Sequence, residues 1–98
     1  MIINRDEILN ILKNYKKNNI NKYDILELGL FGSVARNQAS SSSDVDICIK
    51  TKTPDMFVLV HIKEELQKLL SSSIDIVRIR DRMNPYLKNR IDKEAIYV

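Results

Sequence analysis

The chain has 98 residues, which is room for one domain, since compact domains mostly contain about 100–150 residues. An enzyme that needs a second domain for its second substrate is therefore excluded, unless a partner supplies that domain. The composition, 44% hydrophobic and 30% charged, is typical of a globular protein. The net charge of +3 is mild and the chain has no Trp, which argues against direct nucleic-acid binding.

The expected location is the cytoplasm. No run of about 18 apolar residues predicts a membrane span, and the N-terminus lacks the apolar core of a signal peptide. A single cysteine, Cys48, excludes an internal disulfide and any metal site built from cysteines.

Apolar spacing predicts helices, and short apolar runs bounded by Gly, Ser or Asn predict strands. In chain order the expected elements are a helix at 5–18, a strand at 25–31, a short helix within 33–38, a strand at 44–50, a helix at 55–71, a strand at 74–80 and a helix that starts at Asn84–Pro85. Strands interleaved with helices predict one sheet covered by helices, in the α/β or α+β class.

The first chemical feature is Gly32–Ser33, which follows a predicted strand and precedes a predicted helix. Glycine lets a backbone approach a ligand closely, and the N–H groups at a helix start can hold phosphate. A plain turn uses the same residues, so this feature by itself decides nothing.

The second feature is a pair of carboxylates, Asp44 and Asp46, on a predicted strand whose apolar residues alternate with them. Alternation places both on one face, about 7 Å apart, from where they can converge on a hard divalent cation. Two solvent-facing acids remain the alternative. Asp is a poor strand former, however, and these two lie in an otherwise apolar segment.

A third acid, Asp75, lies between two isoleucines in the last predicted strand. If that strand lies beside the second, Asp75 converges on Asp44 and Asp46. An acid buried there is costly unless it is paired or metal-bound. Glu27 and Asp55 are competing acids, but neither shares the strand geometry. Three carboxylates and a phosphate-holding turn suit phosphoryl or nucleotidyl transfer.

Gly32–Ser33, ten residues, and then Asp44-x-Asp46 resemble the signature of the DNA polymerase β-like nucleotidyltransferase superfamily. The stretches Gly32–Arg36 and Ser43–Ile47 look most like the minimal nucleotidyltransferase (MNT) group, and the element order also fits along most of the chain. Asn37 departs from the family pattern, where a glycine often follows the arginine; Asn is the next-best residue for a left-handed backbone.

The resemblance implies one minimal nucleotidyltransferase domain over residues 1–98, with a mixed sheet, that uses ATP and two Mg²⁺ ions. Asp44 and Asp46 would ligate metal, and Asp75 would be the third acid, which ligates metal or accepts the proton of the acceptor hydroxyl. The implied nucleotide-binding residues are Gly32, Ser33, Arg36 and Ser43. Arg36 could instead brace the loop against a carboxylate, which is the role we expect.

Chains of this kind are commonly encoded with a helical HEPN ribonuclease toxin. The resemblance implies an antitoxin that transfers AMP from ATP to a tyrosine of that toxin. A non-catalytic antitoxin that only covers its partner remains an alternative, as does a small-molecule nucleotidyltransferase of the aminoglycoside-modifying type.

Three further features have simpler interpretations. Cys48 is expected to be a small buried side chain, and His61 a solvated one. Met56 and Phe57 lie near the start of their predicted helix and Val60 lies outside its main apolar stripe, so the three leave extra apolar surface that could be a contact patch.

Overall fold

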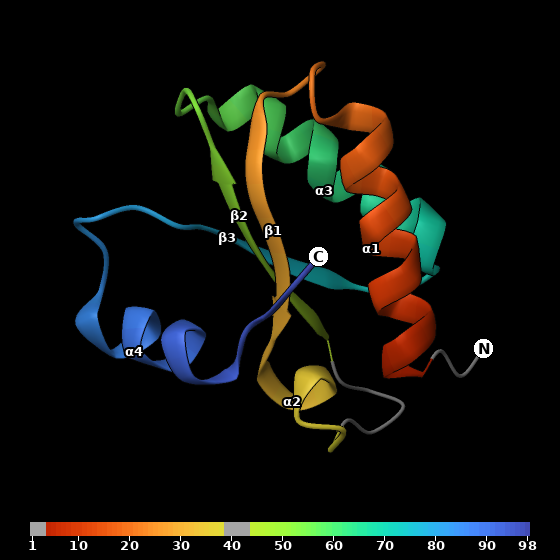
Figure 1. Cartoon of the computed structure of the whole chain (residues 1–98), viewed down its shortest axis with the longest axis vertical. Coiled ribbons are helices and arrows are strands. Elements are labelled where there is room, and N and C mark those ends of the chain that lie inside the picture. The colour runs from red at the N-terminus through yellow and green to blue at the C-terminus, as the bar shows by residue number, and fades with distance from the viewer. Residues whose placement is uncertain (1–3, 39–43) are drawn as a thin grey trace.

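A four-stranded mixed sheet with helices on both faces organises the protein (Figure 1). The computed structural model describes residues 4–38 and 44–98. In chain order its elements are α1 (Arg5–Asn19), β1 (Ile25–Phe31), α2 (Gly32–Ala35), β2 (Val45–Thr51), α3 (Met56–Leu70), β3 (Ile74–Arg78), α4 (Pro85–Glu94) and β4 (Ile96–Tyr97). The fold class expected from the sequence is confirmed.

The strands are ordered β3-β2-β1-β4 across the sheet. β1 is antiparallel to both β2 and β4, whereas β2 and β3 are parallel and are connected through α3. A parallel pair needs such a crossover, because its second strand must start at the same end of the sheet as the first. β3 lies at the edge of the sheet. It starts at the same end of the sheet as β2, and the predicted acids lie at that end.

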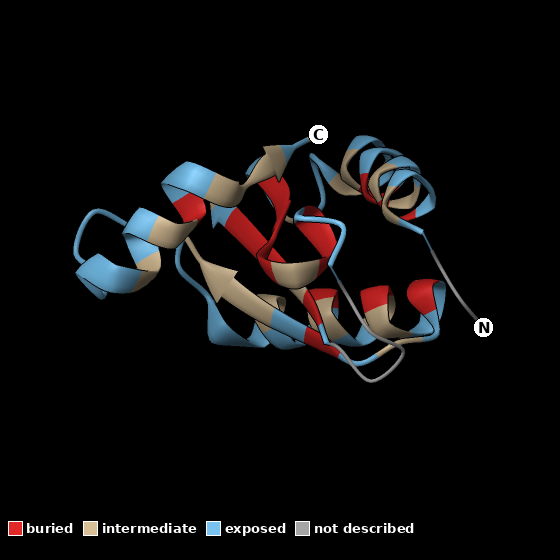
Figure 2. Cartoon of the chain, turned by 90° about the horizontal axis from the view of Figure 1, so that it is seen from below, coloured by how far each residue is buried: buried red, intermediate tan, exposed pale blue. Residues whose placement is uncertain are grey.

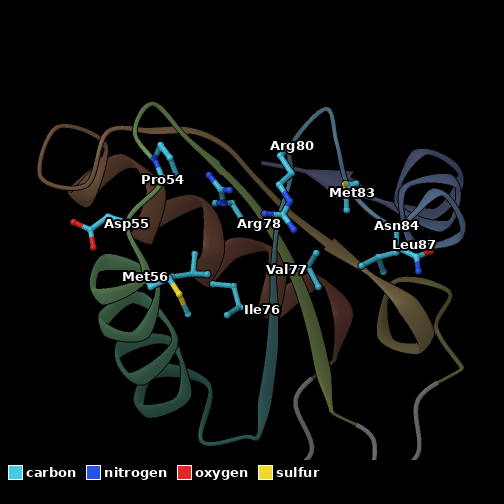
Figure 3. A pocket seen from close by; sticks show the side chains of 11 residues that line it. Pro54, Asp55, Met56, Ile76, Val77, Arg78, Arg80, Met83, Asn84 and Leu87 are labelled. Atoms are coloured by element: carbon cyan, nitrogen blue, oxygen red, sulfur yellow. Dashed lines mark hydrogen bonds between the residues drawn. The ribbon is translucent and has the colours of Figure 1, made fainter.

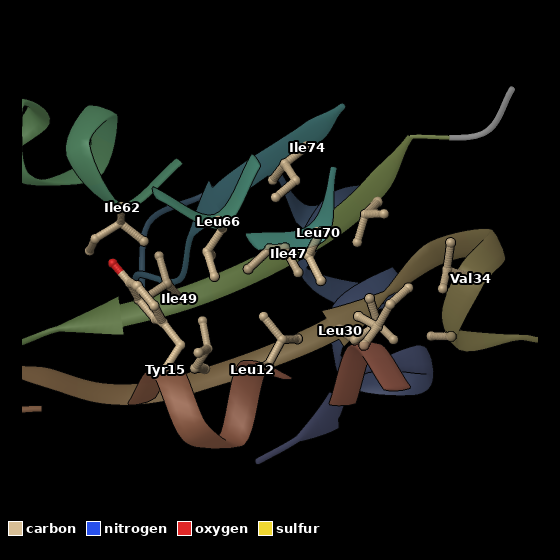
Figure 4. Close-up of a cluster of buried hydrophobic side chains, with 14 of the residues drawn as sticks. Leu12, Tyr15, Leu30, Val34, Ile47, Ile49, Ile62, Leu66, Leu70 and Ile74 are labelled. Carbon is tan, nitrogen blue, oxygen red and sulfur yellow. The ribbon is translucent and has the colours of Figure 1, made fainter. Parts of the chain in front are cut away.

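Alternate residues of β2 face two separate apolar clusters, as the sequence pattern predicts. Ile47 and Ile49 belong to the main core, which α1 and α3 cover with residues such as Leu12 and Leu66 (Figure 4). Cys48 faces the other side of the sheet, where it packs in a smaller cluster with Phe31 of β1 and Ile91 of α4. Figure 2 shows how much less α4 is buried than the sheet: Ile91 is its one buried residue.

Three helices begin at side chains that accept hydrogen bonds from their first turns. These capping residues are Asn4, Asp55 and Asn84, for α1, α3 and α4. An N-cap oxygen satisfies backbone N–H groups that have no partner within the helix. The predicted starts near Asp55 and at Asn84–Pro85 are therefore confirmed, and Pro85 occupies the first turn of α4.

The bounds of α1, β2 and α3 differ from the prediction by one residue at most, and larger differences occur elsewhere. The short helix covers Gly32–Ala35 and ends before Asn37, whose φ of 59° is left-handed. β3 ends at Arg78, two residues early, and β4 was not predicted. β4 has only two paired residues, which is too short for an alternating pattern. None of the helices within residues 4–38 and 44–98 is long and apolar enough to cross a membrane.

Candidate active site

The turn from β1 into α2 requires a glycine at position 32. Gly32 has a φ of +77°, and a Cβ built on it would overlap the carboxylate of Asp46, 2.9 Å from that side chain's Cγ. A larger residue would therefore meet backbone strain and an acidic group at once. The missing side chain lets the β1–α2 turn lie directly against the acid of β2.

Two of the predicted acids lie side by side on neighbouring strands. Asp46 of β2 pairs in parallel register with Asp75 of β3. Asp44 precedes β2 by one residue and is exposed, while Asp46 is half-buried. Asp75 is exposed as well, so the expectation that burial makes this acid costly is wrong. Its neighbour Ile74 on the same strand is buried, so the two residues face opposite sides of the sheet and only Ile74 lies in the core.

The electrostatic environment of Asp46 disfavours its negative charge. Burial raises the pKa of Asp46, and the negative charges of Asp75 and Asp44 raise it further. Arg90 and Arg36 lie near enough to lower it in part. Like charges close together resist joint ionisation. A bound cation would therefore reduce the repulsion among these carboxylates.

The donor chemistry at this cluster fits Mg²⁺, which prefers carboxylate oxygens and usually takes one or two of them together with phosphate and water oxygens. In the described parts of the chain, no three acidic, histidine or cysteine side chains are grouped closely enough to hold a metal by themselves. The arrangement therefore suits a magnesium ion that arrives with a phosphate ligand better than a closed, all-protein metal site.

Glu94, the last residue of α4, joins that helix to the glycine turn. Its Oε1 accepts a hydrogen bond from Nη1 of Arg36 at 2.7 Å, and its Oε2 accepts one from the backbone N–H of Gly32 at 3.2 Å. Nη2 of Arg90 lies 3.7 Å from the same Oε2. Arg36 is thus paired with a carboxylate, as expected for a residue that braces the loop.

Sequence reasoning missed Glu94 and Arg90 as parts of this site. The guanidinium of Arg90 lies 5.7 Å from the centre of the Phe31 ring, next to the glycine turn. One signal for Glu94 was available: an acid in the last turn of a helix opposes the helix dipole, so it needs a partner elsewhere. No local pattern gives the position of that partner, because Arg36 is 58 residues away in the chain.

The remaining residues singled out in the sequence are not among the carboxylates of the acidic cluster. Ser33 is half-buried in α2, whereas Ser43 lies outside the described residues. Asp55 caps α3 and does not belong to the acidic cluster. Cys48 is buried, and burial raises the pKa of its thiol to about 11, as expected for an unreactive packing residue. His61 is exposed, as expected.

Comparison with known proteins identifies the family. Residues 6–98 match the family model described as polymerase beta, nucleotidyltransferase. A protein of Methanocaldococcus jannaschii, provisionally named a protein adenylyltransferase, is 37% identical over 93 residues, covering 94% of this chain and 95% of its own. The protein adenylyltransferase MntA of Thermococcus cleftensis is 30% identical over 94 residues, covering 95% and 94%.

Solved structures share the fold at lower identity. A toxin–antitoxin complex with AMP-PNP contains a chain that superimposes with a TM-score of 0.74 at 23% identity, covering 97% of this chain and 72% of that one. A complex of tri-AMPylated Shewanella oneidensis HEPN toxin with MNT antitoxin gives a TM-score of 0.70 at 21% identity, covering 95% and 70%. By fold and by sequence, the chain belongs to the polymerase β nucleotidyltransferase family, among the small relatives named protein adenylyltransferases.

Proposed function

We propose that this protein is a Mg²⁺-dependent protein adenylyltransferase that acts as the antitoxin of a HEPN/MNT pair. It would transfer AMP from ATP to a tyrosine of the partner HEPN ribonuclease toxin. The observation that carries the proposal is the parallel pairing of Asp46 with Asp75 beside the Gly32 turn. Its curated relatives are named for the same reaction.

In this reaction the acceptor oxygen attacks the α-phosphorus of ATP. A new phosphorus–oxygen bond forms, the bond to the β-phosphate bridge breaks, and pyrophosphate leaves with the electron pair. Mg²⁺, expected as two ions held by Asp44, Asp46 and Asp75, would neutralise the phosphates. Asp75 is exposed on the edge strand, so it can also accept the proton of an incoming hydroxyl.

The glycine turn would bind the β- and γ-phosphates at Gly32 and Ser33, through the close approach that Gly32 allows and the N–H of Ser33 at the helix start. Ser43 is proposed for the nucleotide site from its motif position alone. Arg36 is held by Glu94, and we assign it the task of fixing the turn. Because the reaction consumes ATP, we place both partners in the cytoplasm.

The partner assignment follows the solved complexes. One contains a HEPN toxin that carries AMP groups, bound to an MNT antitoxin, and another contains an ATP analogue. At 98 residues this chain can hold the nucleotide and the metal ions, and the acceptor comes with the partner.

The test measures AMP transfer and cell protection together. The HEPN toxin chain proposed as the partner is expressed with the wild type or with an Asp44→Asn/Asp46→Asn variant. Growth is followed, and label from α-³²P-ATP is traced in vitro. We expect the wild type to label the toxin and restore growth, and the variant to do neither.

Two other outcomes would contradict the proposal. Full protection by the unlabelled double variant would mean that the chain neutralises its partner by binding alone. Transfer of AMP to an aminoglycoside, with no HEPN chain present, would instead indicate a small-molecule nucleotidyltransferase.

A further inference from the structure

Large apolar side chains are exposed at the N-terminal end of α3. Met56 is 80% exposed and Phe57 is 81% exposed, and Val60, one turn later, is 51% exposed. Single exposed apolar residues are common on protein surfaces, but a group of adjacent ones points to a binding surface. The candidate active site uses none of the three.

A pocket of about 540 Å³ adjoins this group and lies between α3, β3 and α4 (Figure 3). Most of its lining is apolar and comes from all three elements: Met56, Leu59, Ile76, Val77, Met83 and Leu87. We call this pocket the β3 groove. It has the size and the apolar lining of a site that receives a few side chains of a ligand.

The β3 groove adjoins the acidic cluster. Its lining includes Val77, which follows Asp75 by two residues on β3. Residues two apart on a strand face the same side and are about 7 Å apart. A chain segment lying in the groove can therefore place a side chain next to Asp75. Because β3 is an edge strand, its outer side is also open to a partner within the described residues.

The charged residues that line the groove indicate the charge of its partner. Arg78 and Arg80 line it. The one acid in the lining is Asp55, and its carboxylate accepts hydrogen bonds from the first N–H groups of α3. The groove therefore presents positive charge next to apolar surface. A second copy of this chain would bring the same arginines into opposition, whereas an acidic partner complements them.

We propose that the β3 groove docks an acidic, apolar segment of the acceptor protein and thereby presents the acceptor hydroxyl to Asp75. The identity of that protein as the substrate rests on the proposed function. The apolar side chains of the segment fill the space lined by Met56 and Leu87, and its acids pair with Arg78 and Arg80. Docking and chemistry thus use adjacent but different residues.

The experiment separates docking from chemistry with variants that place a negative charge at exposed positions. Met56→Glu and Arg80→Glu alter the groove, and Leu69→Glu and Lys17→Glu are matched controls on exposed residues away from it. For each variant, calorimetry measures the affinity for the HEPN chain proposed as the partner and the affinity for ATP. We expect both groove variants to weaken partner binding at least about tenfold, the effect of one important interface residue.

The same two variants should leave ATP affinity within about twofold, while both controls bind the partner as the wild type does. Asp46→Asn should show the opposite pattern, with the complex retained and AMP transfer lost. If the wild type binds its partner through the groove and yet transfers no AMP, then the proposed function fails and the docking surface stands.

Three results would overturn the docking proposal. Unchanged partner affinity in both groove variants would place the interface elsewhere. A parallel loss of ATP affinity would mean that the groove belongs to the nucleotide. If the isolated chain were a dimer that Arg80→Glu dissociates, a second copy would be the occupant.

Discussion

Gly32 is the residue on which the geometry of the candidate site depends most. It combines a left-handed backbone with a position so close to Asp46 that a Cβ would overlap the carboxylate. The sequence showed only that Gly32 follows a predicted strand. It did not predict the left-handed backbone or the contact with Asp46. The overlap with Asp46 follows from the antiparallel register, in which Phe31 lies opposite Asp46.

Gly32→Ala should lower the free energy of unfolding by about 2 kcal/mol or more, through backbone strain and the clash with Asp46. Urea denaturation of the single variants and of Gly32→Ala/Asp46→Ala separates the two causes. Removing the carboxylate relieves the clash, so the double variant should be more stable than the sum of the single effects predicts. Strict additivity would show that the two residues do not meet.

Glu94 is the second residue on which the glycine turn depends. Its carboxylate accepts hydrogen bonds from both Arg36 and the N–H of Gly32. Glu94→Gln keeps the size of the side chain and removes its charge. We expect ATP affinity to fall about threefold to tenfold, the range for one weakened charge-assisted hydrogen bond. Asp92→Asn is the control, since Asp92 is exposed on the same helix. Equal ATP affinity in the two variants would assign Glu94 no part in nucleotide binding.

At the scale of elements, a shared carboxylate joins α1 to α3. Glu65 of α3 accepts hydrogen bonds from the hydroxyls of Tyr15, at 2.7 Å, and Tyr23, at 2.6 Å. Burial raises the pKa of Tyr15, and the bond to Glu65 raises it further. For Glu65, burial acts to raise the pKa, but the two tyrosine hydroxyls outweigh it and lower the pKa overall. The ionised form of Glu65 is therefore the one that stabilises the fold.

Because its pKa is lower in the folded state, Glu65 contributes stability at neutral pH that is lost as the pH falls through that pKa. Glu65→Gln should cost roughly 1–2 kcal/mol at pH 7, and the difference from the wild type should shrink as the pH approaches 3. Thermal unfolding across this pH range measures it. Exposed Glu64, the neighbouring residue, provides the control variant Glu64→Gln. A difference that stays constant with pH would contradict this role for Glu65.

The sequence predicted the elements well where residues alternate between the two faces of a strand. In β2 this alternation places Ile47 and Ile49 in one apolar cluster and Cys48 in the other. Cap residues such as Asp55 and Asn84 predicted where helices start. It could not predict β4, because two paired residues carry no periodic signal. The proximity of Glu94 to Arg36, and the exposure of Asp75, depend on how distant elements pack.

At the scale of the whole molecule, the two ends of β3 have different tasks in this account. Asp75 near its start lies in register with Asp46. Ile76, Val77 and Arg78 toward its end line the β3 groove. A short chain can thus hold a nucleotide site and an adjoining docking surface on one edge strand.

We propose that the site containing the acids of β2 and β3 catalyses the transfer of AMP from ATP to a protein partner. The most direct measurement is the intact mass of the HEPN chain after it is purified from cells that contain either the wild type or Asp44→Asn/Asp46→Asn. We expect a mass gain of one or more AMP groups, located on tyrosine, with the wild type only. An unmodified HEPN chain from cells that the wild type protects would contradict this proposal.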